Sequence, residues 1–393
     1  MLTRLLSGDF PRSRVLSALL ILILLYLATA PFLFPGARAL NVAATICVSI
    51  VLVASFDLLL GYCGVVSFAH AMFYGIGAYG VAIAMYSMGP TWGAMATGAA
   101  AGLALSVLLS FLIALISLRV KAIFYTMMTL AFGAAFGALV MRLSNLTGGD
   151  DGRTFRLPEV LMPAFRPFES EVFGITVNGR VFTYYLVFSV SVLLFLLMLR
   201  VVNSRFGRVL EAIRENEFRA EAIGYRTLYY RIAINCLAAA LATCAGILMA
   251  LWLRYVGPQT TVGFNVMLNI LLMAVIGGLG TVYGAVVGVA LFVVAENYLQ
   301  SLMGGLSGSL SGTPLLAKLF HPDRWMLWFG LVFVLSVYFF PSGIVGKLRG
   351  VVTGRKGLGR GVPEVSKMTT VANASHVTNL PKVPNVPKAE AAQ

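Results

Sequence analysis

Three ionisable residues, Asp57, His70 and Glu296, lie inside long apolar stretches of the 393-residue sequence. A charged side chain at the centre of a bilayer costs about 2.5 to 3.5 kcal/mol on insertion scales, so such residues mark span ends or functional pathways. We expect Asp57 and Glu296 near span ends, in contact with water and headgroups, where a structural role is favoured over a proton relay. His70 lies deeper. It is a candidate for lining a pathway, against the alternative of a hydrogen-bonded packing histidine.

Glycine clusters in two apolar stretches are the second feature that could serve a pathway. Small residues in a membrane let helices approach closely, or they permit a break in a helix whose exposed backbone lines a cavity. Both interpretations stay open for residues 61–88, which we expect to form one span, and for the cluster that begins at Gly277. The glycines that we select as pathway candidates beside His70 are Gly75, Gly77, Gly277, Gly278 and Gly280.

The charged segment GRVLEAIRENEFRAEAIG, from Gly207 to Gly224, predicts a single helix between spans. Its Ala, Glu, Leu and Arg residues are strong helix formers, and Gly224 can take the left-handed conformation that ends a helix. The expected apolar edge comprises Val209, Ile213, Ala220 and Ile223. The helix is either a solvated connector or a docking site for a cytosolic partner.

A glycine- and aspartate-rich turn follows the expected fifth span. Its residues Gly148, Gly149, Asp150 and Asp151 predict a tight turn at the outer mouth of that span. The turn lacks the spaced oxygen ligands of a calcium loop, so we expect no metal here. The sequence contains no P-loop motif and no clustered nucleophile or acid, so we expect no catalytic residues, no cofactor and no nucleotide site on this chain.

These residues must be positioned by membrane-spanning helices. Only 11 % of the residues are charged, against roughly 25 % in soluble domains, and the mean hydropathy is +0.89. Breaking the long apolar runs near Gly61, at Gly89–Pro90 and near Gly280 yields ten spans of about 20 residues each. The predicted fold class is an all-α polytopic membrane protein with about ten transmembrane helices.

The polar segments predict the domain organisation. Residues 1–14 form a cytoplasmic N-terminus, and residues 15–341 form the transmembrane domain, with an outer loop at 144–180 and a cytoplasmic loop at 200–231. Residues 342–393 form a basic, proline-containing tail, for which we expect disorder and contact with anionic lipids.

The distribution of basic residues predicts the orientation. With both termini inside, 20 of the 29 Lys and Arg residues lie on the cytoplasmic side. The net charge of +14 therefore reflects topology, and we expect no nucleic-acid partner. The first span is expected to be retained, because Pro31 argues against a signal-peptide cleavage after Ala30.

The two glycine clusters fall in the third and eighth expected spans, five spans apart. Two halves of five helices would have opposite orientations, which is the arrangement of an inverted repeat. In the second cluster, Gly280, Gly284 and Gly288 recur every four residues, so we expect them on one helix face.

From about Ala39 to Pro341 the sequence resembles the permeases of ABC importers for branched-chain amino acids, in particular their LivM-type subunits. The stretches that carry this resemblance are GYCGVVSFAHAMFYGIGAYG, TLAFG with NLTGGDDG, EAIRENEFRAEAIG and IGGLGTVYGAVVGV. The resemblance implies that the third stretch is the loop that contacts the ATPase subunits. The residues it places in that coupling role are Glu211, Glu215, Asn216, Glu217, Ala220 and Gly224.

The resemblance also implies a bacterial cytoplasmic (inner) membrane location and several partners. These are a LivH-like second permease subunit, two cytosolic ATPase subunits that carry ATP and Mg, a periplasmic substrate-binding protein and an amino acid substrate. Two alternatives remain open: a permease for urea or another small neutral solute, and, in a different class, a stand-alone secondary transporter or channel.

Overall fold

The computed structural model describes residues 14–33, 36–117, 122–166, 178–309, 321–339 and 343–346. Of the cytoplasmic N-terminus expected at residues 1–14 the structure describes only residue 14. Of the basic tail expected at residues 342–393 it describes only residues 343–346, which are helical, so the expected disorder does not hold there. Part of the expected outer loop, residues 167–177, lies outside the described residues as well.

The described part of the chain is a bundle of long apolar helices, nine of which are long and apolar enough to cross a membrane. A shorter apolar helix, α16, follows them. The predicted all-α polytopic fold is confirmed, with nine candidate spans in the described residues where about ten were expected. The nine candidate spans and α16 comprise the helices α2 (Arg14–Leu33), α3 (Ala37–Asp57), α4 (His70–Met88), α5 (Trp92–Ser117), α6 (Ala122–Arg142), α8 (Gly179–Val202), α11 (Thr227–Leu253), α13 (Phe264–Gly277), α14 (Val282–Ser309) and α16 (Trp325–Phe339).

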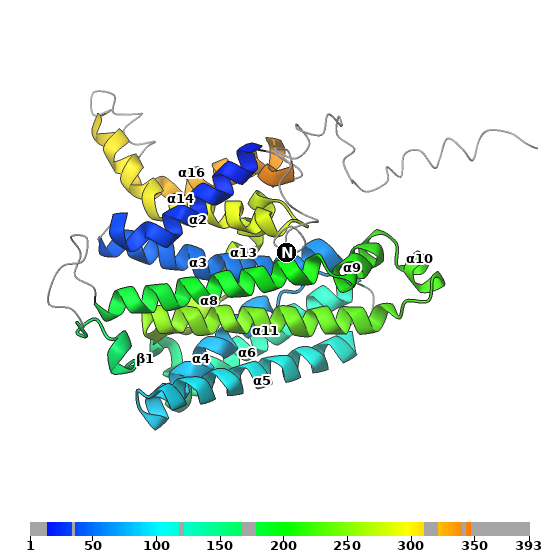
Figure 1. Cartoon of the computed structure of the whole chain (residues 1–393), viewed down its shortest axis with the longest axis horizontal. Coiled ribbons are helices and arrows are strands. Elements are labelled where there is room, and N and C mark those ends of the chain that lie inside the picture. The colour runs from blue at the N-terminus through cyan, green and yellow to red at the C-terminus, as the bar shows by residue number, and fades with distance from the viewer. Residues whose placement is uncertain are drawn as a thin grey trace, which may run out of the picture. The chain divides into compact units, whose positions relative to one another are not determined.

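Short elements cap the two ends of the bundle. Figure 1 shows α9 and α10 at one end and β1 at the opposite end. Strands β1 and β2 pair antiparallel, with Arg153 opposite Val256. The short elements are η1 (Leu58–Tyr62), α7 (Ser144–Thr147), η2 (Gly149–Asp151), β1 (Arg153–Thr154), η3 (Glu159–Leu161), α9 (Arg205–Glu215), α10 (Glu217–Ala222), β2 (Tyr255–Val256), α12 (Pro258–Thr261) and η4 (Pro322–Arg324).

Helix α3 forms the centre of the bundle. In its candidate span 89 % of the residues are buried, and in those of α4 and α11 the share is 67 %. In the candidate spans of α2 and α6 only 22 % and 17 % of the residues are buried. In a membrane protein the exposed apolar side chains of the outer helices face lipid, so their exposure costs nothing. The bundle is therefore built around α3, α4 and α11, with α2, α5 and α6 toward the bilayer.

The expected third span does not form one helix. Helix α3 continues through a π-helical turn, η1, and α4 begins only at His70. Between them residues 64–67 have no regular secondary structure, and Gly64 has a φ of +76°. A residue with positive φ cannot continue a right-handed helix, and this accounts for the break.

The second glycine cluster is also not one helix face. Helix α13 ends at Gly277 and α14 begins at Val282, which confirms the predicted break near Gly280. Gly278 and Gly280 have φ values of +112° and +78° and lie in the turn. The expectation that Gly280 shares a face with Gly284 and Gly288 is therefore wrong, because only the latter two lie on α14.

Candidate functional site

The charged segment after α8 forms two short helices, not the single helix that was expected. Ser204 accepts a hydrogen bond from the Gly207 amide at the start of α9. Asn216 has an extended backbone and ends α9, and its side-chain oxygen accepts a hydrogen bond from the Arg219 amide to cap α10. The sequence does not reveal this break, because a single asparagine can cap a helix start as well as occupy a helix interior.

The apolar edge of this segment is buried against its own chain. Val209, Ile213 and Ala220 pack together with Tyr230 of α11. Ile223 was expected on the same edge but is 70 % exposed, and Phe218 of α10 is 85 % exposed. The break at Asn216 turns α10 relative to α9, so the side chains after it no longer follow the periodicity of a single helix.

The expected coupling residues occupy different positions on the two helices. Glu217 forms an ion pair with Arg231 at 2.9 Å, and Glu211 and Glu215 are exposed on α9. Asn216 and Ala220 are the capping and packing residues described above. Gly224 has a φ of +99°, which confirms its predicted left-handed conformation.

Arg214 connects this loop to both glycine-containing breaks of the bundle. Its Nη1 atom donates a hydrogen bond to the carbonyl oxygen of Gly61 in η1. A Cβ atom on Gly64 would lie 3.2 Å from Arg214 Cγ, and one on Gly280 would lie 2.8 Å from its guanidinium. The absence of side chains at these positions leaves the space in which the arginine lies. No local pattern in the sequence indicated this contact across 153 positions.

Asp57 forms a direct hydrogen bond between the same two breaks. Its Oδ1 atom accepts a hydrogen bond from the Gly280 amide at 2.8 Å. Asp57 was expected to be reached by water and headgroups, but it is only 2 % exposed. A Cβ atom on Gly61 would overlap both Asp57 Oδ1 and the Gly280 amide, so this junction requires glycine at position 61.

The remaining glycines of the second cluster lie at close backbone contacts. A Cβ atom on Gly277 would overlap the carbonyl oxygen of Gly284 at the start of α14. Gly278 lies against Gly343 of the short described segment 343–346. Together with Gly280, these residues let α13 and α14 reverse direction tightly beside η1.

Gly75 and Gly77 lie on α4 at its packing contacts. A Cβ atom on Gly77 would overlap the Thr243 carbonyl oxygen of α11, and one on Gly75 would overlap the side chain of Val262. His70, at the start of α4, is 1 % exposed, and its Nε2 atom lies 2.8 Å from Ser55 Oγ. The structure thus places these three pathway candidates along α4, apart from the contacts made by Arg214.

The predicted outer turn lies at the other end of the bundle. Gly148 and Gly149 have φ values of +86° and +65°. Asp150 and Asp151 form the exposed turn η2, and the Asp151 carbonyl accepts a hydrogen bond from Tyr255 Oη at 3.0 Å. The positive φ values account for the glycines, and the pairing of β1 with β2 holds the turn against the end of α11.

Comparison with known proteins agrees with this architecture. The family described as "Branched-chain amino acid transport system / permease component" matches residues 38–337. The protein named high-affinity branched-chain amino acid transport system permease protein LivM of Escherichia coli K12 is 27 % identical over 335 residues, which cover 79 % of this chain and 75 % of LivM. LivM of Salmonella typhimurium LT2 is 26 % identical with the same coverage.

A second type of permease protein is also related. LivH of Salmonella typhimurium LT2 is 24 % identical over 246 residues, which cover 61 % of this chain and 78 % of LivH. No solved structure matches the chain significantly. Because the family match covers most of the chain, from the start of α3 into α16, and includes both glycine-containing breaks, the chain belongs to the family of branched-chain amino acid transport system permease components.

Proposed function

We propose that this chain is the LivM-like permease subunit of an ABC importer and forms part of the translocation path for branched-chain or related amino acids. One observation carries the coupling part of the proposal. Arg214, on the loop at one end of the bundle, reaches both glycine-containing breaks, at Gly61 and at Gly280. A partner that moves this loop would therefore move the two places where the spanning helices are interrupted.

The loop offers a surface for such a partner. Phe218 and Ile223 are large apolar side chains that are 85 % and 70 % exposed, beyond the helices that cross the membrane. Exposed apolar side chains grouped on a loop favour a protein contact. The proposed partners are two cytosolic ATPase subunits, which would bind ATP and Mg, since this chain contains no P-loop. The predicted inside location of both termini places the loop in the cytoplasm.

The family also implies a larger assembly in the bacterial inner membrane. We propose that a LivH-like second permease subunit completes the path and that a periplasmic substrate-binding protein delivers the amino acid. The pathway candidates His70, Gly75 and Gly77 on α4 and Gly277, Gly278 and Gly280 at the α13–α14 turn would be regions of the path or supports of its walls.

Co-purification tests the docking surface. The chain is co-expressed with a LivH-like subunit and ATPase subunits, and the ATPases retained on the tagged chain are quantified. We expect Phe218→Asp to abolish their retention, because a buried unpaired charge opposes docking. The control is Leu146→Asp, since Leu146 is 51 % exposed on α7 near the opposite end. Equal retention in both variants would contradict the proposal.

Transport measurements separate the alternatives. Proteoliposomes that contain the complete assembly should accumulate leucine, isoleucine or valine only with ATP inside. Uptake of urea but not of these amino acids would favour the small-solute permease. Uptake by this chain alone, driven by an ion gradient, would favour a stand-alone secondary transporter and reject the energy coupling proposed here.

A further inference from the structure

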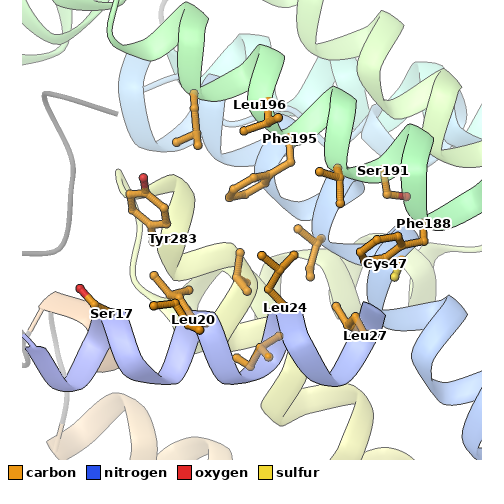
Figure 2. A pocket seen from close by; sticks show the side chains of 16 residues that line it. Ser17, Leu20, Leu24, Leu27, Cys47, Phe188, Ser191, Phe195, Leu196 and Tyr283 are labelled. Atoms are coloured by element: carbon orange, nitrogen blue, oxygen red, sulfur yellow. The ribbon is translucent and has the colours of Figure 1, made fainter. Parts of the chain in front are cut away.

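An apolar pocket lies between α2, α3, α8 and α14, away from the junction at Arg214. Its volume is about 320 Å³. Figure 2 shows Leu20, Leu24 and Leu27 of α2 facing Phe188 and Phe195 of α8 across it. The polar groups of its lining are the hydroxyls of Ser17, Ser191 and Tyr283, and no charged side chain lines it. The pocket therefore suits an apolar ligand and offers a zwitterionic amino acid no charged partner.

Helix α2 is attached near both of its ends, on either side of the stretch that lines the pocket. Near its C-terminal end, Tyr184 Oη donates a hydrogen bond to the Leu27 carbonyl at 2.6 Å, and Tyr185 Oη donates one to the Ala28 carbonyl at 3.0 Å. At its other end, Leu16 is fully buried against Val287 and Val345. The stretch between these attachments stands away from α8 and leaves the cavity.

The pocket opens toward the bilayer. Ile21 and Leu24 of α2 and Leu196 of α8 line it and are 63 %, 51 % and 48 % exposed. All three lie in helices long and apolar enough to span a membrane, so their exposed surface faces hydrocarbon. The lining extends along α2 from Ser17 to Leu27, which corresponds to about 15 Å of helix. A narrow cavity parallel to the spanning helices has the direction of lipid acyl chains.

A basic residue marks one end of this cavity. Leu199 lines it, and the next residue, Arg200, is exposed at the last turn of α8. A basic residue near the membrane surface attracts anionic headgroups by about 1 kcal/mol. A lipid whose acyl chain fills the cavity would therefore have its headgroup near Arg200.

We propose that this pocket binds one acyl chain of an anionic phospholipid, which fills the gap between α2 and α8. This inference is independent of the transport function proposed above. The test uses the full chain in nanodiscs of phosphatidylglycerol that carry a small fraction of phosphatidylglycerol with a photoreactive diazirine on its acyl chain. After illumination, the labelled residues are identified by mass spectrometry.

Labelling of the wild-type chain should be concentrated on the lining residues of α2 and α8. Leu24→Trp and Leu196→Trp each place a larger side chain at the opening, so each should lower this labelling about tenfold, the change that 1.4 kcal/mol produces. The matched controls are Leu22→Trp and Leu193→Trp. Leu22 and Leu193 are 68 % and 62 % exposed on the same two helices but do not line the pocket, and these controls should leave the labelling unchanged.

A matched phosphatidylcholine probe tests the headgroup. We expect its labelling to be about fivefold weaker, as loss of about 1 kcal/mol from one basic side chain predicts. Equal labelling by the two probes would overturn the preference for an anionic lipid. If the lining is labelled no more strongly than the rest of the lipid-facing surface, the proposal that the pocket binds an acyl chain is wrong. It is also wrong if the labelling persists in both Leu24→Trp and Leu196→Trp. If the labelling disappears when a second permease subunit is added, that subunit, and not lipid, occupies the pocket in the assembly.

Discussion

Asp57 Oδ1 accepts a hydrogen bond at 2.8 Å from the amide of Gly280, a residue 223 positions later in the chain. The contact joins the π-helical end of α3 to the turn between α13 and α14. Arg214, which lies on α9, reaches both of these segments. The three segments therefore form one junction, in which a displacement of α9 reaches two interrupted helices at once.

Replacing Arg214 should uncouple the loop from the bundle. Arg214→Ala removes the donor to the Gly61 carbonyl, and we expect it to lose substrate-stimulated ATP hydrolysis in the reconstituted assembly while ATPase binding is retained. Arg208→Ala is the control, since Arg208 is exposed on the same helix. Normal stimulation in Arg214→Ala would show that the loop transmits its movement by another contact.

The close approach of α4 to α11 depends on Gly77. Gly77→Ala places a Cβ atom over the Thr243 carbonyl oxygen, so the helices must separate. Overpacking of this kind costs about 1–3 kcal/mol, and we expect a lower thermal unfolding midpoint in detergent. Gly93→Ala on α5 is the control, since its Cβ atom would meet only Thr91 Oγ1 at 3.9 Å. Equal midpoints in the two variants would exclude tight packing at Gly77.

The conformation of Gly224 predicts which substitutions it accepts. A Cβ atom there would have nothing within 4 Å, so the only penalty is its φ of +99°. Asparagine tolerates the left-handed region better than β-branched residues do. Gly224→Asn should therefore keep stimulated ATP hydrolysis near the wild-type level, whereas Gly224→Val should lower it by misplacing the end of α10. If both variants lose stimulated ATP hydrolysis, Gly224 is required for a contact with a partner and not for its backbone conformation.

The ion pair between Glu217 and Arg231 should contribute modestly to the stability of the loop. Their side chains are 39 % and 22 % exposed, so solvent screens the pair, and we expect a coupling energy of about 0.2–1 kcal/mol. The single variants Glu217→Arg and Arg231→Glu should each weaken ATPase binding, and the double variant should recover part of it. If the double variant binds no better than the singles, Glu217 contacts the ATPase itself.

Tyr184 supplies a hydrogen bond that the backbone of α2 cannot form. Pro31 has no amide hydrogen, so the Leu27 carbonyl four residues earlier lacks its helical donor, and Tyr184 Oη donates to it. Leaving this buried carbonyl unpaired costs about 1–3 kcal/mol, so Tyr184→Phe should lower the unfolding midpoint. In a Pro31→Ala background the restored amide should make Tyr184→Phe much less costly. Strict additivity of the two changes would contradict this account.

Several features of this protein follow from the sequence alone because their causes are local. Hydropathy over about 20 residues determines which segments can cross a bilayer, and the spans and the break near Gly280 agree with it. The left-handed backbone at Gly224 was likewise predictable, because glycine after a helical charged segment is the usual helix stop.

The tertiary structure decided which of these residues meet. Whether Asn216 continued a helix or capped a new one depended on the burial of Val209, Ile213 and Ala220 against Tyr230. The contacts of Arg214 with Gly61 and of Asp57 with Gly280 join segments 153 and 223 positions apart. Periodicity and propensity describe neighbours along the chain, whereas these contacts arise only when the packing of α3, α9 and the α13–α14 turn brings their backbones together.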